Sequence, residues 1–115
     1  MALSFEDSIN PKLTLLLNDP EVKWNKATRV LWLNDGIKKI FYMRGDAMLS
    51  DWDEIEYEDY SITDPKDLII PDLYEQEVIN YVIWKCYLSD SQDEFNMNLA
   101  SSWEQTFRRG MRSDG

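Results

Sequence analysis

The residues whose types and spacing could support chemistry are acidic and lie close together in the middle of the chain. They are Asp51, Asp53, Glu54, Glu56, Glu58 and Asp59. Carboxylates at this density could bind Ca²⁺ or Mg²⁺. A calcium-binding EF-hand loop that started at Asp51 would need glycine at its sixth position and glutamate at its twelfth. These positions hold Glu56 and Ile62, so the segment does not match the pattern. We therefore predict a solvated acidic loop and no metal site.

Other side chains typical of catalysis are scarce. The chain has no histidine, which removes the Ser-His-Asp and Cys-His nucleophile systems and the imidazole metal ligands. The four glycines, at positions 36, 45, 110 and 115, are too scattered for a phosphate-binding loop. Cys86 lies in an apolar run and is expected to be a small buried side chain. We predict no enzyme and no cofactor; a small hydrolase that uses paired carboxylates is the third-ranked alternative.

Composition indicates one folded domain with an acidic surface. The chain has 115 residues, of which 13% are aromatic, and a net charge of −10. Such a charge disfavours non-specific binding to nucleic acid or to anionic membranes. No signal peptide and no apolar run long enough to span a membrane is recognised, so we expect a protein of the cytoplasm.

The charge is distributed unevenly along the chain. Residues 22–44 carry six basic side chains and one acidic one, whereas residues 45–67 carry nine acidic side chains and one basic one. This asymmetry suits subunits that pack head to tail, with a positive face on a negative face. Two ordinary solvated faces are the alternative interpretation.

Hydrophobic periodicity predicts four helices, which would position the acidic segment between the second and the third. Their expected ranges are 5–18, 25–43, 71–89 and 91–109. The third is apolar almost all round, which is typical of a central, buried helix. In the fourth, apolar residues recur every four positions and predict one buried stripe: Phe95, Leu99, Trp103 and Phe107. A short strand that includes Ile55, Tyr57 and Ser61 could interrupt the acidic connection.

Several terminal signals support these ranges. Asp7 or Ser8 can cap the first helix, Asn25 can cap the second, and Gly110 is a plausible stop for the fourth. The second range is ambiguous, because Asn34-Asp35-Gly36 is also a strong hairpin signal. The flanking runs do not alternate as strands with one wet face should, so pattern alone favours one long helix.

Large aromatic residues are the remaining candidates for a special role. They are Trp24, Trp32, Trp84, Trp103 and Phe107. Aromatic side chains of this size dominate both protein cores and subunit interfaces. Spacing alone does not separate these two roles.

The order of short motifs resembles that of a known family. The motifs are Leu16-Leu17-Asn18-Asp19, Val22-Lys23-Trp24-Asn25, Leu31-Trp32-Leu33-Asn34-Asp35-Gly36, Arg44-Gly45-Asp46-Ala47, Leu68-Ile69-Ile70-Pro71 and Leu88-Ser89-Asp90, followed by Asn98, Trp103 and Phe107. The chain thereby resembles the adaptor, or head-completion, proteins that form the head-tail connector of tailed bacteriophages. It departs from their pattern where Lys23 replaces arginine, where Gly45 replaces proline, and in its acidic middle loop.

The resemblance implies a mainly α fold, a four-helix bundle-like adaptor with the long acidic loop between its second and third helices. It implies a helix rather than a hairpin over residues 25–43. It also implies a homo-oligomeric ring, generally dodecameric, beneath the portal protein, which extends the DNA channel and docks a tail or nozzle protein. DNA would pass through this ring without sequence-specific binding, and the protein would reside at the head-tail junction of the virion.

The resemblance further divides the chain into a helical domain, 1–107, and an extended C-terminal tail, 108–115. Related adaptors attach to the portal through this segment, so the expected portal-binding residues are Arg108, Arg109, Met111 and Arg112. The acidic residues from Asp51 to Asp59 are candidates for a channel lining or for a surface that faces the tail. The alternative function is a small acidic phage-encoded binding module, such as a DNA-mimic inhibitor of a host protein.

Overall fold

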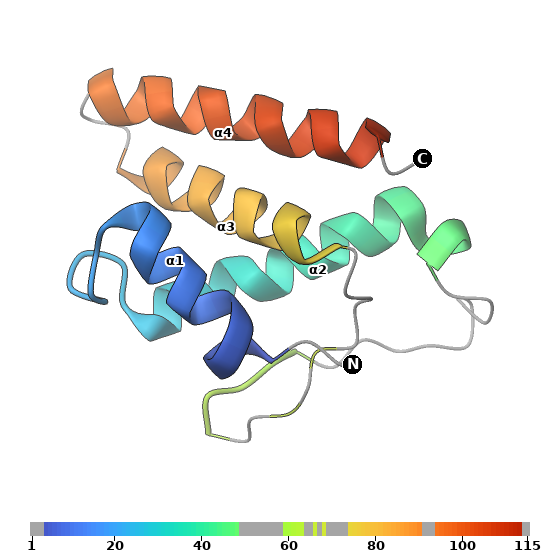
Figure 1. The fold of residues 1–115 in the computed structure, drawn as a ribbon, viewed down its shortest axis with the longest axis horizontal. Coiled ribbons are helices and arrows are strands. Elements are labelled where there is room, and N and C mark those ends of the chain that lie inside the picture. The colour runs from blue at the N-terminus through green and yellow to red at the C-terminus, as the bar shows by residue number, and fades with distance from the viewer. Residues whose placement is uncertain are drawn as a thin grey trace.

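The computed structural model describes residues 4–48, 59–63, 66, 68, 74–90 and 94–113, and within them the chain is mainly helical (Figure 1). A short π-helical turn, η1 (Phe5–Ile9), leads into α1 (Asn10–Leu17). It is followed by α2 (Lys26–Met48), α3 (Glu75–Ser89) and α4 (Glu94–Ser113). The prediction of a mainly helical protein is confirmed. No helix in this described part has the length and apolar character that a membrane span requires.

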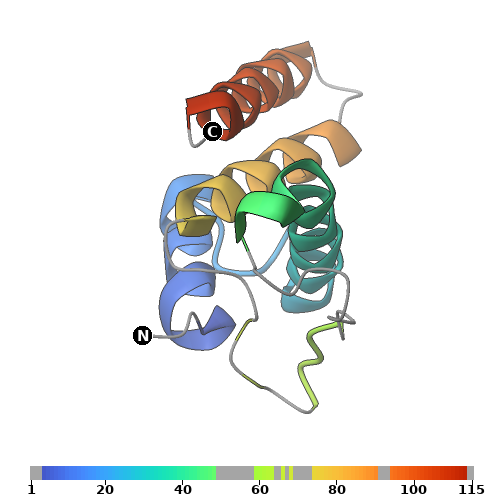
Figure 2. The ribbon, with the colours of Figure 1, turned by 90° about the vertical axis from the view of Figure 1, so that its right-hand side faces the viewer.

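Helix α3 lies at the centre of the molecule, as its apolar sequence predicts. It packs against α4 on one side and against α2 and α1 on the other. Figure 2 shows this arrangement end-on, with α4 above α3 and the other two helices below it. Every residue from Glu77 to Trp84 is buried. Helix α3 runs antiparallel to both α2 and α4 (Figure 1).

Helix α2 is continuous through the segment that could have formed a hairpin. Asn25 caps its start, because the backbone N–H of Thr28 donates to Asn25 Oδ1 over 2.9 Å. Within the helix, Asn34 exchanges two hydrogen bonds with the backbone of Tyr60, at 2.8 and 3.0 Å. These tertiary contacts stabilise the helix at residues that would otherwise favour a turn.

The first helical turn begins at Phe5, as the predicted range of 5–18 has it, but its cap is not one of the predicted residues. The N-cap is Ser4, whose Oγ accepts from the backbone N–H of Asp7 at 3.3 Å, so the expected caps at Asp7 and Ser8 are wrong. Burial of Phe5 anchors this first turn, since Phe5 packs its ring 5.3 Å from that of Tyr60.

The buried stripe of α4 differs from the predicted one. Phe107 is fully buried, but Phe95 is 67% exposed. The buried positions of this helix are Asn96, Ala100, Phe107 and Met111. A strict four-residue repeat advances by about 40° per step around a helix of 3.6 residues per turn, so Phe95 and Phe107 lie about 120° apart. The four-residue pattern therefore misplaced the first of its members.

The predicted extended tail is wrong for residues 108–113, because α4 continues through them. Met111 is only 1% exposed and belongs to the core, which explains why the helix does not stop at Gly110. Gly110 lies against buried Glu77 of α3, and a Cβ atom at position 110 would come within 2.5 Å of Glu77 Oε1. Absence of a side chain at this position lets the end of α4 approach α3 closely.

The connection between α2 and α3 is described only in part. Ile55 and Tyr57, two members of the expected strand, lie outside the described residues. The third, Ser61, occupies an isolated bridge position. Tyr60 and Leu68 are buried, so this connection contributes side chains to the core.

Candidate interaction surfaces

A fully buried arginine joins α1, α2 and the loop between them. Arg29 Nε donates to the carbonyl of Trp24 at 2.8 Å, and its Nη2 donates to the carbonyl of Asp19 at 2.7 Å. Its Nη1 donates to Asn10 Oδ1 at 2.9 Å and to Thr14 Oγ1 at 2.8 Å. These contacts satisfy a charged group that would be costly to bury without partners.

Asp19 is the acidic partner of this arginine and organises the same loop. Its Oδ1 accepts the backbone N–H groups of Val22 and Lys23, both at 3.1 Å, and its Oδ2 accepts that of Trp24 at 2.9 Å. Burial by itself would raise the pKa of Asp19, but these three hydrogen bonds and the charge of Arg29 outweigh it and lower the pKa. Asp19 and Arg29 therefore form a structural ion pair, whose Nη2 and Oδ2 atoms are 3.5 Å apart.

Sequence reasoning missed this pair. Arg29 was counted only among the basic residues of segment 22–44, and Asp19 was noted only as the last residue of the motif Leu16-Leu17-Asn18-Asp19. The two residues are separated by an irregular loop, so no helical or strand period connects them. The abundance of hydrogen-bonding side chains near the end of α1 was the only available signal.

The structure places the large aromatic candidates in or against the core. Trp24, Trp84 and Phe107 are buried, while Trp32 and Trp103 are partly buried and pack against the core. The ring of Trp24 meets that of Tyr87 edge-on at a centroid distance of 5.4 Å. Within the described residues, the buried Nε1 of Trp32 has no hydrogen-bond partner.

Of the six acidic candidates, only Asp59 lies within the described residues. Asp51, Asp53, Glu54, Glu56 and Glu58 lie outside the described residues. Asp59 is exposed, and its Oδ1 lies 2.8 Å from Lys38 Nζ in α2. Among the residues that the structure describes, no group of three or more potential metal ligands occurs.

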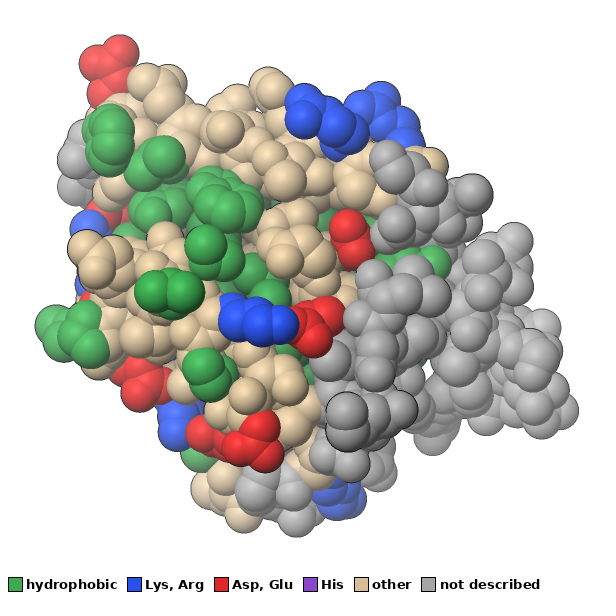
Figure 3. Space-filling view, in the orientation of Figure 1, with side chains coloured by type: hydrophobic (Ala, Val, Ile, Leu, Met, Phe, Trp, Pro, Cys, Tyr) green, Lys and Arg blue, Asp and Glu red, His purple; other side chains and the backbone are tan. Residues whose placement is uncertain are grey.

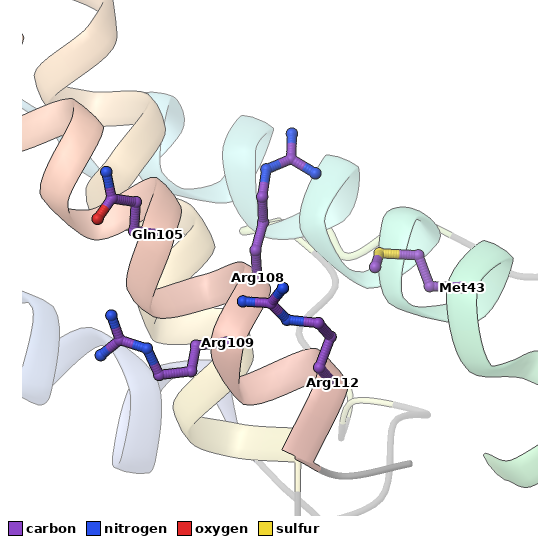
Figure 4. A pocket seen from close by; sticks show the side chains of 5 residues that line it. All are labelled: Met43, Gln105, Arg108, Arg109 and Arg112. Atoms are coloured by element: carbon purple, nitrogen blue, oxygen red, sulfur yellow. The ribbon is translucent and has the colours of Figure 1, made fainter.

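Three of the four predicted tail residues line a cleft instead of an extended arm. Arg108, Arg109 and Arg112 of α4, together with Gln105, form one wall, and Met43 of α2 contributes to the other (Figure 4). The cleft has a volume of about 480 Å³. The fourth predicted residue, Met111, points into the core and is not available at the surface.

Arg108 is held in place within this arginine cleft. Its Nε donates to Glu104 Oε2 at 2.9 Å, one helical turn earlier. Its guanidinium carbon lies 5.7 Å from the ring centroid of Trp84, within the range of a cation–π contact. In Figure 4, Arg108 and Arg112 lie on the side of α4 nearer Met43, with the guanidinium group of Arg112 turned toward Arg108, while Arg109 extends from the other side of the helix.

A second surface is apolar and lies where α4 begins, away from the arginine cleft. Figure 3 shows hydrophobic side chains gathered over α1, α3 and the start of α4. The large exposed hydrophobic residues of these elements are Leu15, Leu16, Leu88, Phe95 and Met97. Leu15 is 78% exposed. We call these exposed residues together the apolar surface, although Phe95 and Met97 lie about 200° apart around α4 and so face different sides of that helix. Exposed apolar side chains of this size are typical of protein-binding sites.

Comparison of the chain with protein-family models, with curated proteins and with solved structures found no match.

Proposed function

We propose that this protein is a structural subunit of a phage head-tail connector, an adaptor ring that joins the portal to the tail and extends the DNA channel. The observation that carries the proposal is the apolar surface, because a lone subunit gains nothing from exposing Leu15 and Phe95 to water. The order of short motifs along the chain supports the same assignment. In this proposal the helices form an adaptor fold of the four-helix-bundle kind, with α4 on the outer side of α3.

The proposed partners are further copies of the chain, the portal protein and a tail or nozzle protein. A net charge of −10 suits a ring around DNA, since an acidic channel repels phosphates and lets the duplex slide. Portal attachment would use a rigid helical end rather than an extended arm, because α4 continues to Ser113. Portal attachment through this helical end does not require Arg108, Arg109 and Arg112 themselves to contact the portal.

Two measurements test the proposal directly. Mass spectrometry of purified particles should detect the protein in the virion. Electron microscopy of the chain mixed with its portal should show an added ring.

A Leu15→Glu, Phe95→Glu variant should remain folded, because both positions are exposed in the monomer. The same variant should fail to form the ring, because it places charges in the proposed contact. Tyr42→Glu, at an exposed position of α2, is the matched control and should assemble normally. Absence from the virion would contradict the proposal.

The acidic composition favours one alternative, a small binding module that mimics the charge of DNA and inhibits a basic host protein. Such a module would bind its target with a strong dependence on salt and would be absent from purified particles. The virion measurement therefore separates the two functions.

A further inference from the structure

The arginine cleft has a regular origin in the sequence of α4. Gln105, Arg108, Arg109 and Arg112 occupy positions i, i+3, i+4 and i+7, which lie on one face of a helix. Phe107 and Met111 alternate with them and point into the core. The buried pair fixes the rotation of the helix, so its basic face is held toward solvent, with Arg108 and Arg112 on the side nearer Met43 and Arg109 on the other side.

Helix stability alone does not explain three arginines here. The negative end of a helix dipole favours cations in the last turn, but Arg108 and Arg112 are one turn apart, where like charges repel. Within the described part of the chain, Arg108 forms an ion pair with Glu104, and no carboxylate lies within ion-pair distance of Arg112. The cleft therefore concentrates positive charge on a strongly acidic protein.

The chemistry of the cleft selects carboxylates as its ligand. A guanidinium group presents a planar fork of N–H donors that matches a carboxylate in two parallel hydrogen bonds. Phosphates fit the same fork, but a chain with a net charge of −10 repels a polyanionic duplex. An acidic polypeptide segment can place several carboxylates together and is the better match.

We propose that the arginine cleft binds the acidic segment, residues 51–59, of a second copy of this chain. This inference rests on the proposed ring and names the contact that forms it. The segment carries six carboxylates in nine residues, which is the densest acidic run in the sequence. A cleft on one copy and a segment on the next make a head-to-tail contact, and contacts of that type close into rings when their rotation allows.

Two charge-reversal variants test the contact. The cleft variant is Arg108→Glu with Arg112→Glu, and the segment variant is Asp53→Lys with Glu56→Lys. Lys12→Glu with Lys39→Glu, two exposed lysines elsewhere, makes the same change of net charge as the cleft variant and is its control. Thermal melting checks that each variant folds, and sedimentation equilibrium measures self-association at low salt.

Wild type should self-associate, with a dissociation constant that rises about tenfold or more when NaCl is raised from about 50 to about 500 mM. Each contact variant should bind itself at least about tenfold more weakly, while the control stays within about twofold of wild type. Mixing the two contact variants should restore one contact per pair, between the intact cleft of one and the intact segment of the other. The mixture should therefore contain at least heterodimers, and because the reversed cleft and the reversed segment also carry substituted side chains of opposite charge, these can pair as well and extend the assembly.

A mixture that stays monomeric would overturn the inference, since it would mean that cleft and segment do not pair between copies. Wild type that remains monomeric at every concentration would overturn it too, even if the protein is present in virions. A cleft variant that self-associates normally but fails to join the portal would assign the cleft to the portal instead. Absence from virions with self-association intact would defeat the proposed function but not the contact.

Discussion

Gly36 of α2 lies directly against the ring of Tyr81 in α3. A Cβ atom at position 36 would come within 2.8 Å of Tyr81 Cδ1, closer than side chains tolerate. The hydroxyl of the same tyrosine donates a hydrogen bond to Asp35, the neighbour of that glycine. Burial and this carboxylate both raise the pKa of Tyr81, so the phenol stays protonated and continues to donate. Asp35 and Gly36 together thus fix the position of the Tyr81 side chain.

Replacing Gly36 with alanine should therefore destabilise the protein. Alanine favours a helix over glycine by about 1 kcal/mol, but overpacking against the ring should cost about 1–3 kcal/mol and outweigh that gain. Urea denaturation measures the difference in the free energy of unfolding. Lys39→Ala, at an exposed position of the same helix, should change it by no more than about 0.5 kcal/mol. A more stable Gly36→Ala variant would show that the ring moves freely.

Replacing Arg29 with methionine should be strongly destabilising. The change keeps an unbranched side chain but leaves the Asp19 carboxylate buried without its cation, which typically costs about 3–5 kcal/mol. The free energy of unfolding from urea titration reports the loss. Arg112→Met, at an exposed position of α4, should have an effect of about 0.5 kcal/mol or less. Equal effects of the two substitutions would mean that the buried network contributes no net stability.

Asp19 should make the fold sensitive to acid. Its pKa is lowered in the folded protein, so its contribution to stability is complete above its ordinary value of 3.8 and is lost as the pH falls through the lower folded value. The free energy of unfolding measured between pH 7 and pH 2 should decline over that acidic range. Asp19→Asn should be less stable at pH 7 and should flatten this part of the curve. The control Asp7→Asn, at an exposed position, should leave the pH dependence of the free energy of unfolding nearly unchanged. If Asp19→Asn also left that pH dependence unaltered, Asp19 would not be its cause.

Cys86 should be inert in the folded protein. Burial raises the pKa of its thiol from 9.0 to about 12, and it is fully buried among core residues. Its thiolate fraction near pH 8 should be about a thousandfold below that of an ordinary cysteine. A coloured thiol reagent should modify it only after urea unfolds the chain. Rapid modification without denaturant would mean that α3 opens readily.

The C-terminal turns of α4 should contribute to stability. Met111→Ala should cost about 2–5 kcal/mol because it empties a buried position, whereas Arg112→Ala should cost about 0.5 kcal/mol or less. Deletion of residues 108–115 should be at least as harmful as Met111→Ala, in contrast to what the predicted extended tail outside the helical domain would imply. Thermal melting and urea titration of the three variants check this order.

Local signals predicted the four helices well. The cap at Asn25 and the apolar sequence of α3 depend on neighbouring residues, so they can be recognised without knowing the fold. Pattern also favoured a helix through Asn34-Asp35-Gly36, although the contacts with Tyr60 and Tyr81 that stabilise it there come from distant segments.

The errors arose where tertiary packing decides the outcome. Met111 follows a glycine that normally ends a helix, and only its place in the core explains why α4 continues. In the sequence, Arg29 resembles an ordinary surface charge. Only the folded structure shows that Asn10, Thr14 and Asp19 surround it. The arginines of α4 were recognised as a candidate binding group, but their arrangement as a cleft with Met43 depends on how two helices meet.

The central position of α3 also bears on how the chain folds as it is synthesised. Helices α1 and α2 emerge from the ribosome first, joined mainly by the polar network around Arg29. Their apolar residues, such as Ile37 and Ile40, have no core to enter until the third helix has been made. Until α3 has been made, the nascent chain must therefore carry these hydrophobic side chains exposed, and α4 covers the remaining face of α3 only after both helices have been synthesised.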